Sequence, residues 1–186
     1  MKRLFDLICV FLSGLVLVWP LIGVAIAVRL TSEGPILFWS QRVGCNNRLF
    51  WMPKFRSMLV ETPNVATHLL DDPSAYLTPI GSFLRKSSLD ELPQLWSIFR
   101  GDMSFVGPRP ALFNQDDLIA ERTRAGVHRI VPGLTGWAQV NGRDELPIPV
   151  KVQFDRDYLD KQTLWFDLKI LWMTFQKVLR RSGVSH

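Results

Sequence analysis

The chain has 186 residues, enough for one domain with a real core, and 47% of them are hydrophobic, which is high for a water-soluble protein. Its net charge of +5 accompanies 7 Trp and 12 Phe, a combination that suits nucleic acid or an anionic membrane surface, and the apolar excess favours the membrane over nucleic acid. Cys9 and Cys45 form no C-x-x-C pair and the histidines are scattered, which argues against a disulfide framework, a zinc site or a histidine-based metal site.

The N-terminal stretch is the first predicted element. Lys2 and Arg3 precede an apolar run from Leu7 to Val28, and Arg29 follows it. A cleaved signal peptide fits poorly, because no small-residue cleavage site ends the run before its last few residues. A transmembrane helix and a re-entrant helix-break-helix both fit the length of the run.

A membrane break is predicted at Trp19-Pro20. Proline removes a backbone donor and clashes with the preceding turn, so it kinks a helix. Each arm then measures about 20 Å or less, too short to cross an apolar core of about 30 Å. Basic residues on both flanks favour keeping both ends on the cytoplasmic side. Because proline is also tolerated in spanning helices, the residues alone leave both forms open.

The rest of the chain predicts an α+β domain that is mainly helical. Apolar-aromatic runs at 36–39 and 49–52 flank a Gly/Asn turn and predict a β-hairpin. Residues 61–79 indicate a loop, 100–110 a Gly/Pro-rich loop, and 132–143 a second Gly-rich loop with a strand-like patch at 137–140. Helices are expected over 80–99 (broken at 87–88), 114–125, 150–161 and 164–181.

The helix predicted over 164–181 combines a wide apolar face with basic residues on one side. Such a helix can be an ordinary core helix. Trp, Phe and Leu together with Lys and Arg are typical of a helix that lies in the membrane interface, and the apolar N-terminus favours this interpretation.

The most informative stretch carries the adjacent acids Asp90 and Glu91. Ser88 precedes Glu91 by the spacing of a capping box, so a helix should begin near Leu89 with both acids in its first turn. Neighbours on a helix point about 100° apart, so one acid can attack a substrate while the other holds a metal. Acids are also common at helix starts for purely structural reasons, and Glu91 can simply cap.

Basic groups in constrained loops accompany these acids. Arg109 stands between two prolines, which limit the local backbone, and its guanidinium suits a phosphate. Each loop alone would be interpreted as a turn with a solvated charge, but acids and basic loops together indicate diphosphate chemistry at a membrane surface. The further candidate ligands are Lys54 and Arg56 for phosphate, and Gly133, Gln139, Asn141 and Arg143 for the nucleotide or sugar.

The motifs KFRSM (54–58), SLDELPQL (88–95), GDMSFVGPRP (101–110), PGLTGWAQVNGR (132–143), DLKI (167–170) and RSGVS (181–185) resemble those of the small monotopic phosphoglycosyl transferases, a family of bacterial sugar transferases. The resemblance runs from Lys2 to Ser185. It implies a re-entrant membrane segment over 1–30 and a catalytic domain over 31–186, on the cytoplasmic side of the bacterial inner membrane.

The resemblance also implies a reaction. Asp90 would attack a UDP-sugar, release UMP and pass the phospho-sugar to undecaprenyl phosphate, giving undecaprenyl-diphospho-sugar. Glu91 would bind Mg²⁺ and Arg109 would hold a phosphate. One departure concerns the membrane break, where the family commonly has Ser before Pro and this chain has Trp19, so the angle of the break is not implied.

Other functions remain to be separated from this one. A membrane-bound hydrolase of nucleotide-sugars or prenyl diphosphates would use the same acids and arginines but pass the phosphoryl group to water. A module that is not an enzyme, and instead binds a membrane surface or nucleic acid through basic residues, would show a contiguous Lys/Arg patch, whereas basic residues here are dispersed among Gly/Pro loops. The residues identify neither the sugar nor the glycan, and they leave a monomer and a homodimer equally open.

Overall fold

The computed structural model describes residues 1–65, 70–142 and 146–180. The helices are α1 (Lys2–Thr31), α2 (Gly81–Ser87), α3 (Leu95–Arg100), α4 (Asp116–Arg124), α5 (Trp137–Asn141), α6 (Ile148–Lys161) and α7 (Leu164–Arg180), with short 3₁₀ helices η1 (Cys45–Asn47), η3 (Pro73–Tyr76), η4 (Leu89–Gln94) and η5 (Val127–Arg129). The strands are β1 (Leu37–Val43), β2 (Leu49–Phe55), β3 (Ser104–Val106) and β4 (Gly133–Thr135). The predicted mainly helical α+β class is confirmed.

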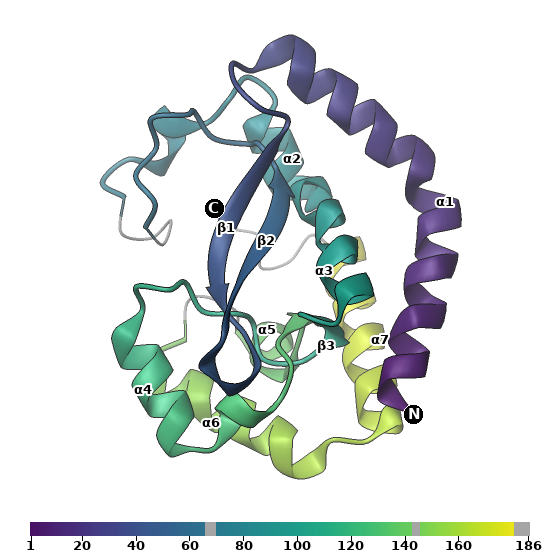
Figure 1. Cartoon of the computed structure of the whole chain (residues 1–186), viewed down its shortest axis with the longest axis vertical. Helices are drawn as coiled ribbons and strands as arrows, with labels where there is room; N and C mark the ends of the chain where they lie inside the picture. The colour runs from purple at the N-terminus through teal and green to yellow at the C-terminus, as the bar shows by residue number, and fades with distance from the viewer. Residues whose placement is uncertain (66–69, 143–145, 181–186) are drawn as a thin grey trace.

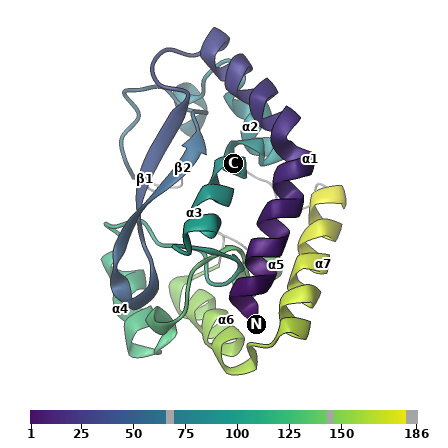
Figure 2. The ribbon, with the colours of Figure 1, turned by 45° about the vertical axis from the view of Figure 1, so that its right-hand side comes forward.

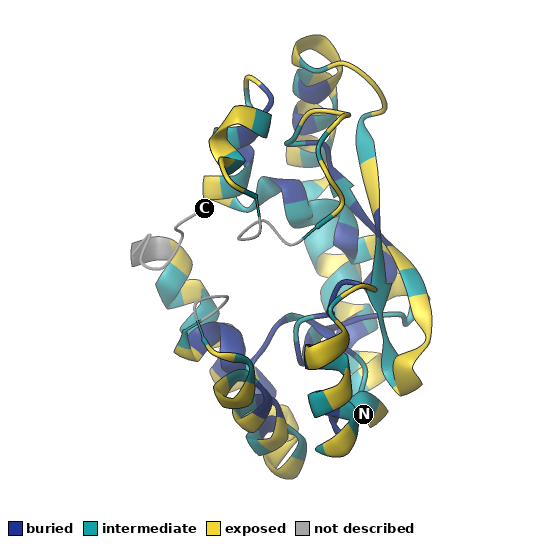
Figure 3. Cartoon of the chain, turned by 90° about the vertical axis from the view of Figure 1, so that its left-hand side faces the viewer, coloured by how far each residue is buried: buried dark blue, intermediate teal, exposed yellow. Residues whose placement is uncertain are grey.

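The elements are arranged in layers. The β1–β2 hairpin lies on one side of the helical segment α2–η4–α3, and α1 lies on the other (Figures 1 and 2). Helices α4 to α7 close one end of the molecule, where α6 packs against both α4 and α5. Exposed residues follow the outward sides of these elements and buried residues the inward sides (Figure 3). The central segment α2–η4–α3, which holds the acidic pair, is therefore covered from two directions.

The predicted hairpin is confirmed and is longer than expected. Its strands pair antiparallel, with Leu37 opposite Phe55 and Val43 opposite Leu49. Asn46 and Asn47 in the turn have φ of 54° and 58°, a conformation that asparagine tolerates better than most residues. The Gly/Asn turn signal therefore located the hairpin correctly.

The strand-like patch predicted at Trp137–Val140 is wrong, because these residues form the short helix α5. The strand of this loop is β4, which pairs in parallel with β3. Ala138, Gln139 and Val140 are all buried, as consecutive residues can be in a helical turn packed on several sides. Four residues are too few for periodicity to separate a buried helical turn from a strand.

The start of α1 is fixed to the domain by polar contacts. Lys2 Nζ donates to Asp167 Oδ2 at 2.6 Å and to the Tyr158 hydroxyl at 3.2 Å. Arg3 donates to two carbonyl groups near the end of α3. Asp6 is only 3% exposed and accepts hydrogen bonds from a hydroxyl and an N–H of β3. The first turns of this apolar helix are thus joined to the rest of the chain by charged groups.

The far end of α1 is fixed to the same domain by apolar contacts. Val24 and Val28 are buried in a cluster with Phe55 and Leu84. No residue of the segment 11–20 between the two attachments is buried. Both ends of the helix therefore lie against one domain, while its apolar middle is open to its surroundings.

The predicted break at Pro20 takes the form of a bend. The helix runs from Lys2 to Thr31 without interruption, with Pro20 inside it, and its two halves point in different directions (Figures 1 and 2). Trp19 is 77% exposed, so its side chain lies outside the packed domain. Within the described residues, α1 is the one helix whose length and composition suit a membrane crossing.

Helix α7 is buried on one side and apolar on the other. Asp167 and Ile170 face the domain and are nearly inaccessible. Trp165 is 82% exposed and Trp172 59%, and Leu164, Leu168, Phe175 and Val178 are exposed as well. A soluble domain rarely exposes such a continuous apolar surface. This burial pattern agrees with the interfacial interpretation of the helix.

Candidate active site

The hairpin brings Lys54 to the acidic pair. Met52 on β2 packs with Ile98 of α3. Lys54 lies two residues further along and so on the same face of the strand, where it meets η4. Its Nζ donates to Glu91 Oε1 at 2.8 Å. The strand therefore places a cation beside the acids from one side.

Arg109 reaches Glu91 from the loop that follows β3. Its Nη2 donates to Glu91 Oε1 at 3.2 Å, so one carboxylate oxygen receives both cations. The Arg109 side chain remains 37% exposed, compared with 16% for Lys54. The Arg109 side chain is thus partly accessible to solvent.

The two neighbouring acids have opposite electrostatics. Burial raises the pKa of Asp90 to about 6, against the attraction of Lys54 and with the added repulsion of Glu91. Burial also disfavours ionised Glu91, but Lys54 and Arg109 outweigh it and hold the pKa of Glu91 well below its usual range. Glu91 is therefore a permanent anion, while Asp90 is an anion held in an unfavourable environment.

A further cation, Arg85 of α2, belongs to this cluster, and the sequence analysis missed it. Burial lowers the pKa of Arg85, while Asp90 and Glu91 raise it and Arg109 lowers it further. Arg85 therefore lies within electrostatic reach of all three groups. Arg85 precedes Asp90 by five residues with a helix break between them, so no sequence pattern indicated that the two lie close together. Only the fold of α2 against η4 brings it there.

The predicted capping box at Ser88 is wrong. A helical segment does begin at Leu89 with Asp90 and Glu91 in its first turn, but it is the 3₁₀ helix η4, and Ser88 makes no side-chain cap. Ser88 has φ of 57° because it ends α2 and starts η4 at once. Glu91 cannot cap in return, since its carboxylate binds Lys54 and Arg109. The Oε1 oxygen of Glu91 is thus bound by the two cations.

The glycines of the two loops pack against each other. A side chain on Gly133 would meet the N–H nitrogen of Gly107 at 2.1 Å, and one on Gly136 would meet the carbonyl oxygen of Gly107 at 2.1 Å. Gly133 is therefore required for the close approach of β4 to the loop that carries Arg109. Its predicted part in substrate binding is not tested by this contact.

The other candidates of the second loop make local contacts or lie outside the described residues. Gln139 is buried and donates to the carbonyl of Leu134, and its Oε1 has no partner among the described residues. Asn141 is exposed and donates to the carbonyl of Trp137. Arg143 lies outside the described residues. Binding roles for these three side chains stay predictions.

Arg56 has a structural contact of its own. It is 9% exposed and its Nε donates to the carbonyl of Pro35 at 2.8 Å. This bond ties the end of β2 to the segment that leaves α1. The structure therefore brings together Lys54, Asp90, Glu91 and Arg109 of the predicted site, and it places Arg56 at the base of the hairpin.

The donor set suits a magnesium ion only together with a substrate. Among the described residues there is no cluster of three or more carboxylate, His or Cys side chains. Mg²⁺ in phosphoryl-transfer sites is commonly held by one or two carboxylates, with water and substrate phosphates completing the shell. The ionised Glu91 provides one such carboxylate. Because Lys54 and Arg109 repel a free cation, the site favours an ion that arrives with a diphosphate.

The chain is similar to known proteins over nearly its whole length. The profile of a family described as Bacterial sugar transferase matches residues 1–181. The Bacillus subtilis protein named "Uncharacterized sugar transferase EpsL" is 40% identical over 186 residues, which cover 100% of this chain and 90% of that protein.

Two relatives carry names that state an activity. The UDP-glucose:undecaprenyl-phosphate glucose-1-phosphate transferase of Xanthomonas campestris pv. campestris is 42% identical over 172 residues, covering 87% of this chain and 35% of that protein. The undecaprenyl-phosphate galactose phosphotransferase of Salmonella typhimurium is 39% identical over 202 residues, covering 98% of this chain and 41% of that protein. The chain thus spans less than half of each of these two proteins.

Proposed function

This chain belongs to the bacterial sugar transferase family, and from that premise we propose that it transfers a phospho-sugar from a UDP-sugar to undecaprenyl phosphate. The observation that carries the proposal is the contrast within one acidic pair. Glu91 is neutralised by Lys54 and Arg109, while Asp90 next to it is buried and destabilised as an anion. Such a carboxylate is suited to attack a phosphorus atom.

The proposed reaction has two displacements at one phosphorus. An Asp90 carboxylate oxygen attacks the β-phosphorus of the UDP-sugar, the bond from that phosphorus to the bridging oxygen breaks, and UMP leaves. A phosphate oxygen of undecaprenyl phosphate then attacks the same phosphorus, and the Asp90 carboxylate leaves. The product is undecaprenyl-diphospho-sugar, and the ionised Asp90 is regenerated without any net proton transfer.

The cations around the pair have separate tasks in this proposal. Arg109 and Arg85 face the negative charge of the diphosphate, and Lys54 holds Glu91 in place. Glu91 would hold Mg²⁺, which when bound supplies further neutralisation of the phosphate oxygens. Fixed positive charges of this kind stabilise a phosphoryl-transfer transition state more than a substrate.

The membrane-bound substrate requires a membrane-bound enzyme, and α1 and α7 supply the apolar surface. Because both ends of α1 attach to one domain, we propose a monotopic arrangement in which α1 enters the bilayer and returns, with the bend at Pro20 in the apolar layer. The exposed tryptophans of α7 would lie at the interface. The domain and its site would then face the cytoplasm of a bacterial inner membrane.

The test is release of UMP from a panel of UDP-sugars by purified protein with Mg²⁺ and undecaprenyl phosphate. We expect sustained release that depends on the lipid, and its loss in Asp90→Asn. Asp160→Asn, an exposed acid of α6 paired with Arg156, is the matched control and should retain full activity. Steady release without the lipid would indicate the hydrolase instead, and unchanged turnover in Asp90→Asn would remove Asp90 from the mechanism.

A further inference from the structure

The backbone carbonyl groups of three consecutive residues in the loop that carries Arg109 all accept hydrogen bonds. The Pro108 carbonyl accepts from the Gly133 N–H at 2.9 Å, and the Pro110 carbonyl accepts from Arg42 Nη1 at 3.3 Å. Between them, the Arg109 carbonyl accepts from Arg122 Nη1 at 2.7 Å. The shortest of these contacts is therefore made to the residue that itself contacts Glu91.

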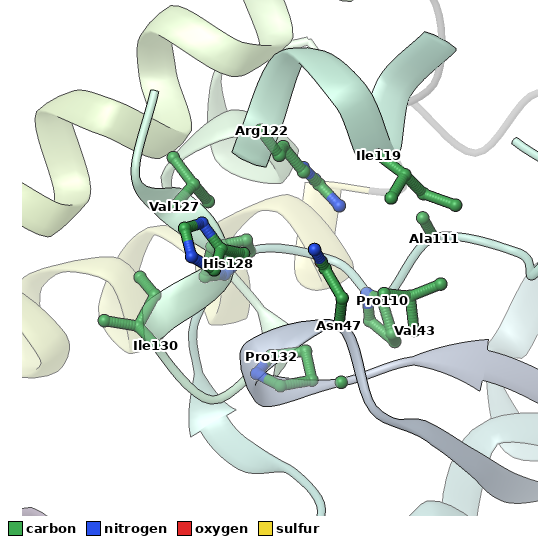
Figure 4. A pocket seen from close by; sticks show the side chains of 12 residues that line it. Val43, Asn47, Pro110, Ala111, Ile119, Arg122, Val127, His128, Ile130 and Pro132 are labelled. Atoms are coloured by element: carbon green, nitrogen blue, oxygen red, sulfur yellow. The ribbon is translucent and has the colours of Figure 1, made fainter. Parts of the chain in front are cut away.

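Arg122 is unusually constrained for a charged side chain. It lies on α4, is 8% exposed, and directs Nε and Nη2 to the same oxygen of Asp155 at 2.9 Å and 2.7 Å. Asp155 on α6 is 1% exposed, and burial raises its pKa despite the attraction of Arg122. Figure 4 shows Arg122 extending from α4 into a cavity that Asn47 enters from the hairpin turn and that Pro110 borders.

A buried ion pair is a poor device for stability alone. The cost of removing both charges from water commonly equals their attraction, and apolar residues often replace such pairs without loss. A guanidinium offers donors in a planar fork, however, and Asp155 occupies one edge of that fork. The remaining Nη1 is thereby aimed at the Arg109 carbonyl.

We propose that Arg122, oriented by Asp155, is a positioning residue that fixes the backbone of Arg109 so that its guanidinium meets the substrate diphosphate. The inference rests on the proposed role of Arg109 as a phosphate ligand. It assigns a function in substrate binding to a pair on α4 and α6 that touches neither of the catalytic acids. Removing the contact of Arg122 with the Arg109 carbonyl should therefore weaken diphosphate binding through Arg109 and through no other group.

The test measures binding of inorganic diphosphate to the full-length protein in detergent by isothermal titration calorimetry. Arg122→Lys keeps the charge beside Asp155 but cannot provide the fork, and we expect its Kd to rise about tenfold, equivalent to one misplaced charged contact. Arg124→Lys is the matched control, since Arg124 lies on the same helix, is exposed and pairs only locally with Glu121 among the described residues. It should change the Kd by less than about twofold.

A double-mutant cycle separates positioning from general structural damage. In an Arg109→Ala background, Arg122→Lys should leave the Kd unchanged within about twofold, because the group that it positions is absent. A purely structural role would weaken binding by the same factor in both backgrounds, which would overturn the proposal. Equal Kd values for Arg122→Lys and Arg124→Lys, or no diphosphate binding by the parent protein, would overturn it as well.

A second variant covers the outcome in which Arg122→Lys does not fold, as judged by circular dichroism. Asp155→Asn keeps an oxygen opposite Arg122 but loosens the fork, and we expect a change in the same direction of about threefold, again absent without Arg109. An unchanged Kd in folded Asp155→Asn would contradict the proposal. The binding measurement needs no nucleotide, sugar or lipid. A failure of the transferase assay would therefore not affect its outcome, and the two proposals can fail separately.

Discussion

Two groups of buried charged residues in this molecule contain the same residue types but differ in how their carboxylates are paired. At the start of α1, Asp167 receives a hydrogen bond from Lys2 and another from Tyr158, and Asp6 receives two from β3. At the start of η4, Lys54 and Arg109 both donate to Glu91, while Asp90 beside it is left as a carboxylate that burial disfavours.

The first group of charges holds the fold together, and the second contains the charges that we propose take part in the reaction. In the first group each carboxylate is matched by donors, and burial together with Asp167 raises the pKa of Tyr158, so that it remains a donor. In the second group the donors are concentrated on one acid of two. A buried carboxylate whose charge is not fully compensated is a stronger nucleophile candidate than one that is, because attack on phosphorus relieves the unfavourable charge.

The largest effect should follow from Asp90→Asn. Loss of the proposed nucleophile should lower turnover at least about a thousandfold. The fold favours protonated Asp90, so its contribution to stability is complete below the ordinary aspartate pKa of 3.8 and is lost as pH rises through about 6. At pH 7.5 the neutral asparagine should therefore raise the free energy of unfolding, by about 1–3 kcal/mol. Thermal unfolding in detergent measures this, and a destabilised variant would contradict the contrast.

Glu91→Gln should combine both kinds of damage. Lys54 and Arg109 would lose their shared carboxylate oxygen, and we expect turnover to fall about a hundredfold and stability to fall by about 1–3 kcal/mol, since the site is only partly exposed. UMP release and thermal unfolding on one preparation give both values. If Glu91→Gln lost activity but gained stability, as expected for Asp90→Asn, the contrast between the two acids would be contradicted.

The pH profile should report the ionisation of Asp90. With a pKa of about 6, kcat/KM for the UDP-sugar should be constant above pH 7 and should fall about tenfold by pH 5, because only the ionised acid attacks. This ratio reflects the first displacement and the free enzyme. A flat profile between pH 5 and 8 would place the pKa of the attacking group far lower than the buried environment of Asp90 implies.

The smallest effect on chemistry should come from the structural group. Lys2→Met leaves Asp167 buried without its cation, and we expect a loss of about 2 kcal/mol in unfolding free energy with kcat of the folded protein changed by less than about twofold. Lys161→Met, at an exposed position of α6, is the control and should alter neither. If Lys2→Met lost most of its kcat at unchanged stability, Lys2 would belong with the residues that take part in the reaction and not with those that hold the fold.

The sequence predicted those parts of the site that are local in the chain. The acids at 90 and 91 share one turn, and Arg109 is marked by its two prolines, so both were recognised without a fold. The role of Ser88 was predicted wrongly because a capping box and a helix-to-helix junction share the same residue types, and only φ at this serine distinguishes them.

The parts that escaped prediction depend on distant segments. Arg85 joins the acids only because α2 turns back onto η4, and the Arg122–Asp155 pair joins residues 33 positions apart. Gly133 stays a predicted part of the nucleotide or sugar site, and the structure adds that its missing side chain admits the backbone of Gly107. A close approach can be inferred from a glycine, but the partner that approaches depends on the fold.

The attachment of α1 also sets the order in which the protein can be completed. The contacts of Arg3 and Asp6 join segments 95 to 99 residues apart, whereas the partner of Lys2, Asp167, follows 165 residues later. At typical synthesis rates of about 5–20 residues per second, roughly 10–30 s separate the synthesis of Lys2 from that of Asp167. The attachment through α7 is therefore the last of the polar attachments of α1 to become available.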